Sequence, residues 1–169
     1  MKFILIDRIT LLEPPHRILA TKSLTLAEEY LADHFPTFPV MPGVLMLEAM
    51  VQSAAWLVRA SQDFAHSMVV LEEAKNVNYK SFVAPGRTLE VSAEAVEISE
   101  RWSEFKTLGR SGDQEMVKAR IRLRHYNLAD TNAAMSEVDD RLIADIRKRF
   151  ELLGGPGVLN RTDACVAQH

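Results

Sequence analysis

The chain has 169 residues, of which 47% are hydrophobic and 25% are charged, with a net charge of -3. This length suits a single domain with a buried core, and mild acidity without a long basic run argues against nucleic acid as a ligand. The single cysteine, Cys165, excludes an intrachain disulfide and a cysteine metal cluster, and it fits a reducing cytoplasm. The apolar run in the N-terminal segment MKFILIDRIT is too short for a signal peptide. The chain has no stretch of about 18 consecutive apolar residues, so no membrane span is predicted.

The first third of the chain predicts two short strands followed by two helices. Residues Ile9–Leu12 and Arg17–Leu24 are typical of strands, and a proline-containing turn joins them. We expect a short helix over Leu26–Asp33, which the prolines of the HFPTFP stretch end. A long helix then covers Gly43–Val58, with Pro42 at its start, where a missing N–H costs nothing.

The long helix is the most informative segment, because its only polar side chains are Glu48, Gln52 and Ser53. A helix that is apolar on nearly every face is normally wrapped by other structure. A carboxylate desolvated in such a helix needs a partner. His34, the type of residue best suited to exchange protons near neutral pH, lies immediately upstream. The pattern predicts an acid–base pair in an apolar pocket.

After Ser61 the apolar residues alternate, which predicts a run of strands. The expected strands cover Ser67–Leu71, Val77–Phe82, Thr88–Ser99, Arg101–Arg110 and Glu115–Tyr126. Turns at Pro85-Gly86 and Ser111-Gly112-Asp113 are short enough for hairpins. A long helix followed by consecutive strands implies an α+β fold, in which an antiparallel sheet wraps around the helix.

The end of the chain is expected to lie outside this domain. Asn127–Ser136 is polar and resembles a linker, whereas Val138–Leu153 carries apolar residues at helical spacing. This spacing predicts an amphipathic helix that Gly154 ends. We expect the tail from Gly155 onward to be disordered. The predicted organisation is a domain over 1–126, a linker and helix over 127–154, and a tail over 155–169.

The strongest motif is a segment of about 19 residues in which a histidine precedes a glutamate by 14 positions. It reads His34-Phe35-Pro36, Pro39-Val40-Met41-Pro42-Gly43-Val44, Glu48-Ala49-Met50 and Gln52. The segment resembles the active-site segment of the 3-hydroxyacyl-[acyl-carrier-protein] dehydratases of bacterial fatty-acid synthesis. A second segment, Val83-Ala84-Pro85-Gly86, resembles a strand-turn segment of the same family. The resemblance implies the hot-dog fold, a curved antiparallel sheet around a central helix, over about residues 1–126.

Dehydration of a 3-hydroxyacyl thioester needs a base for the α-proton, an acid for the departing hydroxyl, and donors for the enolate oxygen. His34 is the natural base and Glu48 the acid. The N–H of Gly43 lies at the helix start, where free amides favour negative charge. Gln52 is one turn beyond Glu48, where it either holds that carboxylate or a water, or makes a core hydrogen bond. This chemistry requires no metal or organic cofactor.

Other residues bear on the substrate and on the rate. We expect three side chains to bind the acyl substrate beside Gly43 and Gln52: Phe38, Met41 and Val44. The family usually carries different residues at three positions of this chain, which affects substrate length and rate: Thr37, Phe82 and Arg87. Glu48 stands where a related isomerising branch has Asp, which favours plain dehydration. The other histidines show no metal-site spacing and are expected at the surface: His16, His66, His125 and His169.

Two alternatives to dehydration stay open: a hot-dog acyl thioesterase, and a catalytically weakened homologue that binds acyl chains. The resemblance implies a homodimer or a trimer of dimers, with each pocket built from both chains. A lone curved sheet would also expose a strand edge, which natural proteins rarely tolerate. The expected partner is an acidic acyl carrier protein. It would dock on basic side chains of one of two sets: Lys75, Lys80 and Arg87, or Lys106 and Arg110.

Overall fold

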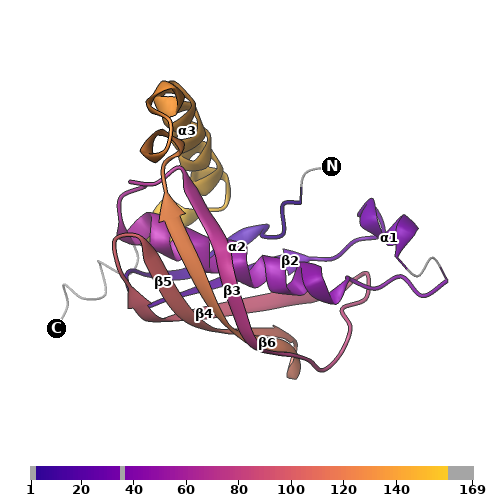
Figure 1. Ribbon diagram of the computed structural model, residues 1–169. Coiled ribbons are helices and arrows are strands. Elements are labelled where there is room, and N and C mark those ends of the chain that lie inside the picture. Colours follow the sequence, from indigo (N-terminus) through magenta and orange to yellow (C-terminus); the bar gives the residue numbers. More distant parts are fainter. Residues whose placement is uncertain (1–2, 35–36, 160–169) are drawn as a thin grey trace.

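A computed structural model describes residues 3–34 and 37–159. In this part of the chain six strands form one antiparallel sheet, in the order β1-β2-β4-β5-β6-β3. The strands are β1 (Arg8–Glu13), β2 (Arg17–Ser23), β3 (Met68–Tyr79), β4 (Thr88–Ile98), β5 (Trp102–Ser111) and β6 (Gln114–Tyr126). The sheet curves around helix α2 (Gly43–Ser61), as Figure 1 shows. The predicted α+β hot-dog architecture is therefore confirmed.

The core lies between α2 and the concave face of the sheet. Along β4 the predicted alternation is present, because Leu89, Val91 and Ala93 are buried and point toward the helix. From α2, Ala49, Met50 and Leu57 are fully buried in the same core. Burial of this many apolar side chains is the main source of the stability of the domain.

One face of α2 stays open, contrary to the expectation of a helix wrapped on every side. Val44 is 66% exposed, and Glu48 and Gln52 are half-buried. The N-terminal segment before β1 covers part of this face, since Leu5 and Ile6 are buried in the core. The carboxylate of α2 is thus placed at the border between the core and an accessible face.

The structure corrects two predicted elements. The helix expected over Leu26–Asp33 is only the short α1 (Tyr30–Asp33), because the residues before it form a turn in which Thr25 Oγ1 accepts the N–H of Ala27. The strands expected over Ser67–Leu71 and Val77–Phe82 are one strand, β3. It pairs with β6 along its length, and the register of this pairing shifts at two β-bulges.

The polar linker contains two short 3-10 helices, η1 (Leu128–Asp130) and η2 (Ala133–Met135), and leads into helix α3 (Ser136–Leu152). Figure 1 shows α3 projecting from the body of the domain. Its first turn is attached by Asp139, whose carboxylate accepts the N–H groups of Leu128 and Ala129 and the hydroxyl of Ser67. Although burial raises the pKa of Asp139, these hydrogen bonds outweigh it and lower that pKa.

The other end of α3 packs against the domain through aromatic rings. The ring of Phe150 stacks on Trp56 at 5.8 Å and meets Phe64 edge-on at 5.3 Å. Gly154, with φ +79°, ends the helix as predicted. The expectation of disorder from residue 155 is wrong for 155–159, which are helical and pack Val158 and Leu159 against the core. The rest of the predicted tail, including Cys165, lies outside the described residues.

Candidate active site on the open face of α2

Glu48 and Gln52 form the polar centre of the open face of α2. The amide Nε2 of Gln52 donates to Glu48 Oε1 at 2.9 Å. The same amide group also holds the N-terminal segment, because Nε2 donates to the carbonyl of Phe3 and Oε1 accepts the N–H of Leu5, each at 3.0 Å. Gln52 therefore fixes the carboxylate oxygen of Glu48 and the adjacent backbone in one network.

The start of α2 offers backbone donors beside a tightly packed glycine. Pro42 precedes the helix and supplies no side-chain cap. Its carbonyl accepts the N–H groups of Leu45 and Met46, which leaves those of Gly43 and Val44 as the donors at the helix start. A Cβ at Gly43 would lie 3.1 Å from the ring of Tyr79. A side chain here would have to displace this partly exposed ring by a few tenths of an ångström, so the glycine lets Tyr79 pack directly on the start of α2.

His34 lies at the end of α1, on the loop that leads toward α2. The side chain is half-buried, and the backbone N–H donates to the carbonyl of Tyr30 at 3.2 Å. The loop is joined to the strand-turn segment farther along, where the N–H of Met41 donates to Val83 O at 2.8 Å. The side chain of Met41 is fully buried in the core, so its contact with a substrate stays a prediction.

Phe38 and Phe82 pack against each other at the surface. Their rings meet edge-on with centroids 6.1 Å apart, and the residues are 59% and 58% exposed. Phe82 is one of the three departures from the family pattern, and Phe38 lies on the histidine loop. The departure thus supplies a ring that supports this loop.

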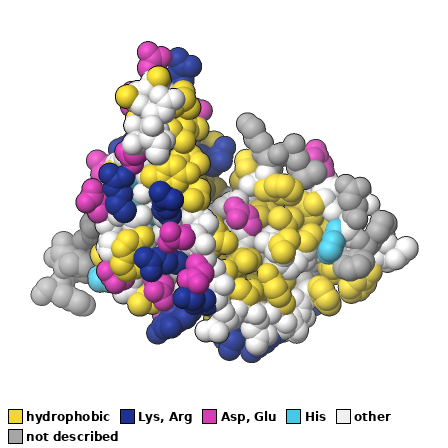
Figure 2. All heavy atoms as spheres, in the orientation of Figure 1, with side chains coloured by type: hydrophobic (Ala, Val, Ile, Leu, Met, Phe, Trp, Pro, Cys, Tyr) yellow, Lys and Arg dark blue, Asp and Glu magenta, His cyan; other side chains and the backbone are white. Residues whose placement is uncertain are grey.

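A cavity of about 210 Å³ extends along the open face from Glu48 and Gln52. Its walls come from α2, from Phe3 and Ile4 of the N-terminal segment, and from the end of α3. Figure 2 shows apolar side chains gathered on the side of the molecule beside α3. The predicted acid therefore borders a cavity large enough for part of a small molecule.

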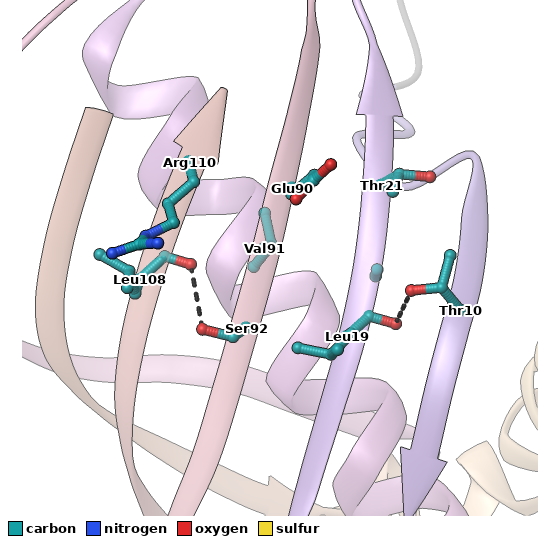
Figure 3. Close-up of a pocket in the computed structure, with 9 residues that line it drawn as sticks. Thr10, Leu19, Thr21, Glu90, Val91, Ser92, Leu108 and Arg110 are labelled. Atoms are coloured by element: carbon teal, nitrogen blue, oxygen red, sulfur yellow. Dashed lines mark hydrogen bonds between the residues drawn. The ribbon is translucent and has the colours of Figure 1, made fainter. Parts of the chain in front are cut away.

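A larger groove of about 430 Å³ lies on the outer face of the sheet. Figure 3 shows its lining on β1, β2, β4 and β5, with α2 behind the strands. Thr10, Leu19 and Ser92 line it, and none of the predicted catalytic or substrate-binding residues does. The sheet separates this groove from the carboxylate of α2, so the smaller cavity is the candidate site.

The predicted carrier-docking side chains differ in their ion pairs. Lys75 pairs with Glu73 at 2.8 Å, and Lys80 pairs with Glu115 at 3.0 Å. The others form no ion pair with any described residue: Arg87, Lys106 and Arg110. Each of the two sets therefore keeps a cation without an ion pair to a described residue, and Arg110 lines the groove on the outer face of the sheet.

His125 is a buried histidine, contrary to the expectation of a surface residue. Its Nε2 lies 2.8 Å from Ser103 Oγ, and its ring lies 5.8 Å from that of His66. Burial lowers the pKa of His125 to about 4 and also lowers the pKa of His66. Among the described residues no group of three His, Cys, Asp or Glu side chains could hold a metal ion. Within the same residues no helix is long and apolar enough to cross a membrane.

Comparison with known proteins places these features in a family. A family model described as a FabA-like domain matches residues 1–120. The 3-hydroxyacyl-[acyl-carrier-protein] dehydratase FabZ of Symbiobacterium thermophilum is 32% identical over 132 residues, covering 78% of this chain and 93% of that protein. The FabZ of Pediococcus pentosaceus is 33% identical over 115 residues, covering 68% and 77%.

Solved structures share the fold at low sequence identity. The dehydratase heterocomplex ApeI:P from Xenorhabdus doucetiae has a TM-score of 0.64 at 13% identity, covering 79% of this chain and 90% of that one. A hypothetical thioesterase with coenzyme A from Streptococcus pneumoniae has a TM-score of 0.55 at 12% identity, covering 70% and 84%. At these identities the likeness concerns the fold alone.

Proposed function

The chain belongs to the FabA-like family, and on that premise we propose that it dehydrates (3R)-3-hydroxyacyl-[acyl-carrier-protein] to trans-2-enoyl-[acyl-carrier-protein] in fatty-acid or related lipid synthesis. The observation that carries the proposal is the placement of Glu48. Its carboxylate borders a cavity on a mostly apolar helix and is held by Gln52 at 2.9 Å. FabZ relatives over most of the chain support the same reaction.

In the proposed mechanism His34 removes the proton from C2 of the thioester. The resulting enolate oxygen accepts a hydrogen bond from the N–H of Gly43 at the start of α2. Glu48 then protonates the C3 hydroxyl, which leaves as water while the double bond forms between C2 and C3. Proton transfer from C2 to the base and from the acid to the leaving oxygen balances the reaction without a cofactor.

The proposed acyl pocket lies around the histidine loop and the start of α2. Val44 and Phe38 are exposed there, and they are the side chains that an acyl chain meets first. The Phe38–Phe82 pair gives this entrance an aromatic wall. The side chain of Met41 is buried beneath the loop, and its proposed role is to support the loop that forms the pocket.

The proposed assembly is a homodimer or a trimer of dimers. Strand β3 is at the edge of the sheet, and Leu71 and Tyr79 on it are partly exposed. A long edge strand with apolar side chains favours pairing with a second copy. We propose that an acidic carrier protein in the cytoplasm delivers the substrate. Its proposed contacts are the cations without an ion pair in the described part of the chain, which are Arg87 in one set and Lys106 and Arg110 in the other.

Turnover of 3-hydroxybutyryl and longer 3-hydroxyacyl thioesters tests the reaction. Dehydration produces enoyl absorbance, and we expect this signal without release of free thiol. Release of thiol without enoyl product would identify a thioesterase. Acyl binding without either product would identify a catalytically weakened homologue.

A further inference from the structure

The cavity beside Glu48 ends at two arginines. Arg59 comes from the last turn of α2 and Arg149 from the last turn of α3, and both line the cavity. Neither side chain forms an ion pair with a described residue. The family model ends at residue 120, so the second arginine comes from a segment beyond it.

Arg59 has no carboxylate among the described residues to balance its charge. Its Nε is buried and has no acceptor among the residues that the structure describes, and its guanidinium lies over the ring of Trp56 at 5.1 Å. Burial, and then the charge of Arg149, lower the pKa of Arg59 to about 10. Two guanidinium groups close enough to act on each other in this way favour an anion between them.

A neighbouring arginine of α3 differs from this pair, because it has a carboxylate partner. Arg147 donates to the carbonyl oxygen of Asp63 at 2.7 Å and to its carboxylate at 3.1 Å. Its guanidinium also lies over the ring of Phe64 at 4.5 Å. The packing of Phe150 holds α3 in place, so Arg149 stays beside Arg59 although their charges repel.

We propose that Arg59 and Arg149 bind an oxyanion carried by the acyl thioester substrate, at the end of the cavity away from the reacting carbons. One continuous cavity contains both arginines and Glu48. Arg59 follows Glu48 by three helical turns, about 16 Å along the axis, and its side chain leans back toward the helix start. A ligand bound at Glu48 can therefore reach the arginine pair.

That the oxyanion belongs to the substrate rests on the proposed function. It is either a carboxylate at the far end of the acyl chain or the phosphate of the phosphopantetheine arm. Both are planar or tetrahedral oxyanions that guanidinium groups bind with two parallel hydrogen bonds. The two sources place the anion on different parts of the substrate, which allows them to be separated by turnover.

Anion binding can be measured without turnover, because Trp56 lies against Arg59 and reports on the pair. In the full-length Trp102→Phe protein, inorganic phosphate and adipate are titrated at constant ionic strength while tryptophan fluorescence is followed. We expect a saturable change, with affinity reduced about tenfold or more by Arg149→Gln. Lys148→Gln removes the same charge one residue away and should leave the affinity unchanged. No saturable change, or equal effects of the two variants, would overturn the site.

Turnover identifies the source of the anion. Thioesters of N-acetylcysteamine with methyl-ended and carboxylate-ended acyl chains are compared, as are thioesters of pantetheine and of its phosphate. Arg149→Gln should raise KM about tenfold only for the substrate that carries the recognised anion. Unchanged KM for all four would overturn the assignment to the substrate, even with phosphate bound. A wild-type protein inactive on all four would refute the proposed function and this assignment together, leaving the fluorescence result to decide the anion site.

Discussion

Removing the Gln52 amide should weaken both the fold and the active site. In Gln52→Ala three hydrogen bonds are lost: those to Glu48, to the carbonyl of Phe3 and to the N–H of Leu5. A typical hydrogen bond contributes about 1 kcal/mol net, and water reaches part of this site. We therefore expect the free energy of unfolding, measured by urea denaturation, to fall by about 2 kcal/mol.

The activity of the same variant should fall less than that of a variant lacking the acid. Gln52 touches no reacting atom in the proposed mechanism, and it acts by holding Glu48. We expect kcat to decrease by about tenfold, below the 10² to 10⁴ attributed to a general acid or base. KM for a short thioester should change less than kcat, because Gln52 lines the cavity but acts on the reaction mainly by holding Glu48.

Gln52→Glu separates positioning from simple structural support. The variant keeps an acceptor for the N–H of Leu5, but it places a second carboxylate one turn from Glu48. Like charges at this spacing repel and favour a proton on the pair. The pH profile of kcat/KM should therefore move to higher pH, and by more than in Gln52→Ala, which removes the donor to Glu48 but adds no charge. The reasoning is refuted if both variants keep the wild-type profile and kcat and lose less than about 0.5 kcal/mol of stability.

Four further outcomes are expected. His34→Ala and Glu48→Gln should each reduce kcat by about 10² to 10⁴, and the double variant should be little slower than either, as single-turnover assays can check. Because the pKa of His125 falls from 6.5 to about 4 on folding, unfolding takes up a proton between these values. This titration should raise stability by up to about 2 kcal/mol from pH 5 to pH 7 in urea denaturation. His125→Gln should remove this contribution and leave the rise of the same sign that comes from the lowered pKa of His66. Charge reversal at Arg87, or at Lys106 and Arg110 together, should raise KM for carrier-bound substrate and spare small thioesters. Incubation with EDTA should leave turnover unchanged, and loss restored by a divalent ion would refute the cofactor-free mechanism.

The sequence predicted best those elements in which one repeating pattern of apolar residues determines which side chains are buried. The alternation along β4 and the apolar run of α2 both follow from side chains that face one concave core. The extent of β3 was predicted wrongly because its middle residues, such as Glu73 and Lys75, are exposed and carry no apolar period. Its pairing with β6, which no local pattern reveals, keeps the strand continuous.

Contacts in the candidate site could be predicted where both residues belong to one short motif. They could not be predicted where segments distant in the sequence meet. The spacing of Glu48 and Gln52 at i and i+4 on one helix indicated their contact. The capture of the N-terminal segment by Gln52 and the pairing of Phe38 with Phe82 join residues more than 40 positions apart. Only the fold brings such residues together, so no spacing along the chain could show them.

Helix α3 shows why the arginine pair needs an explanation beyond stability. The helix is attached by Asp139 at its first turn and by Phe150 near its end, and Leu153 O accepts the N–H of Ile9 on β1. These contacts would be served equally well by a neutral side chain in place of Arg149. A second guanidinium beside Arg59 instead raises the cost of docking, because like charges repel in a partly desolvated cavity. An anion bound in the proposed site between the two guanidinium groups would balance this unfavourable charge.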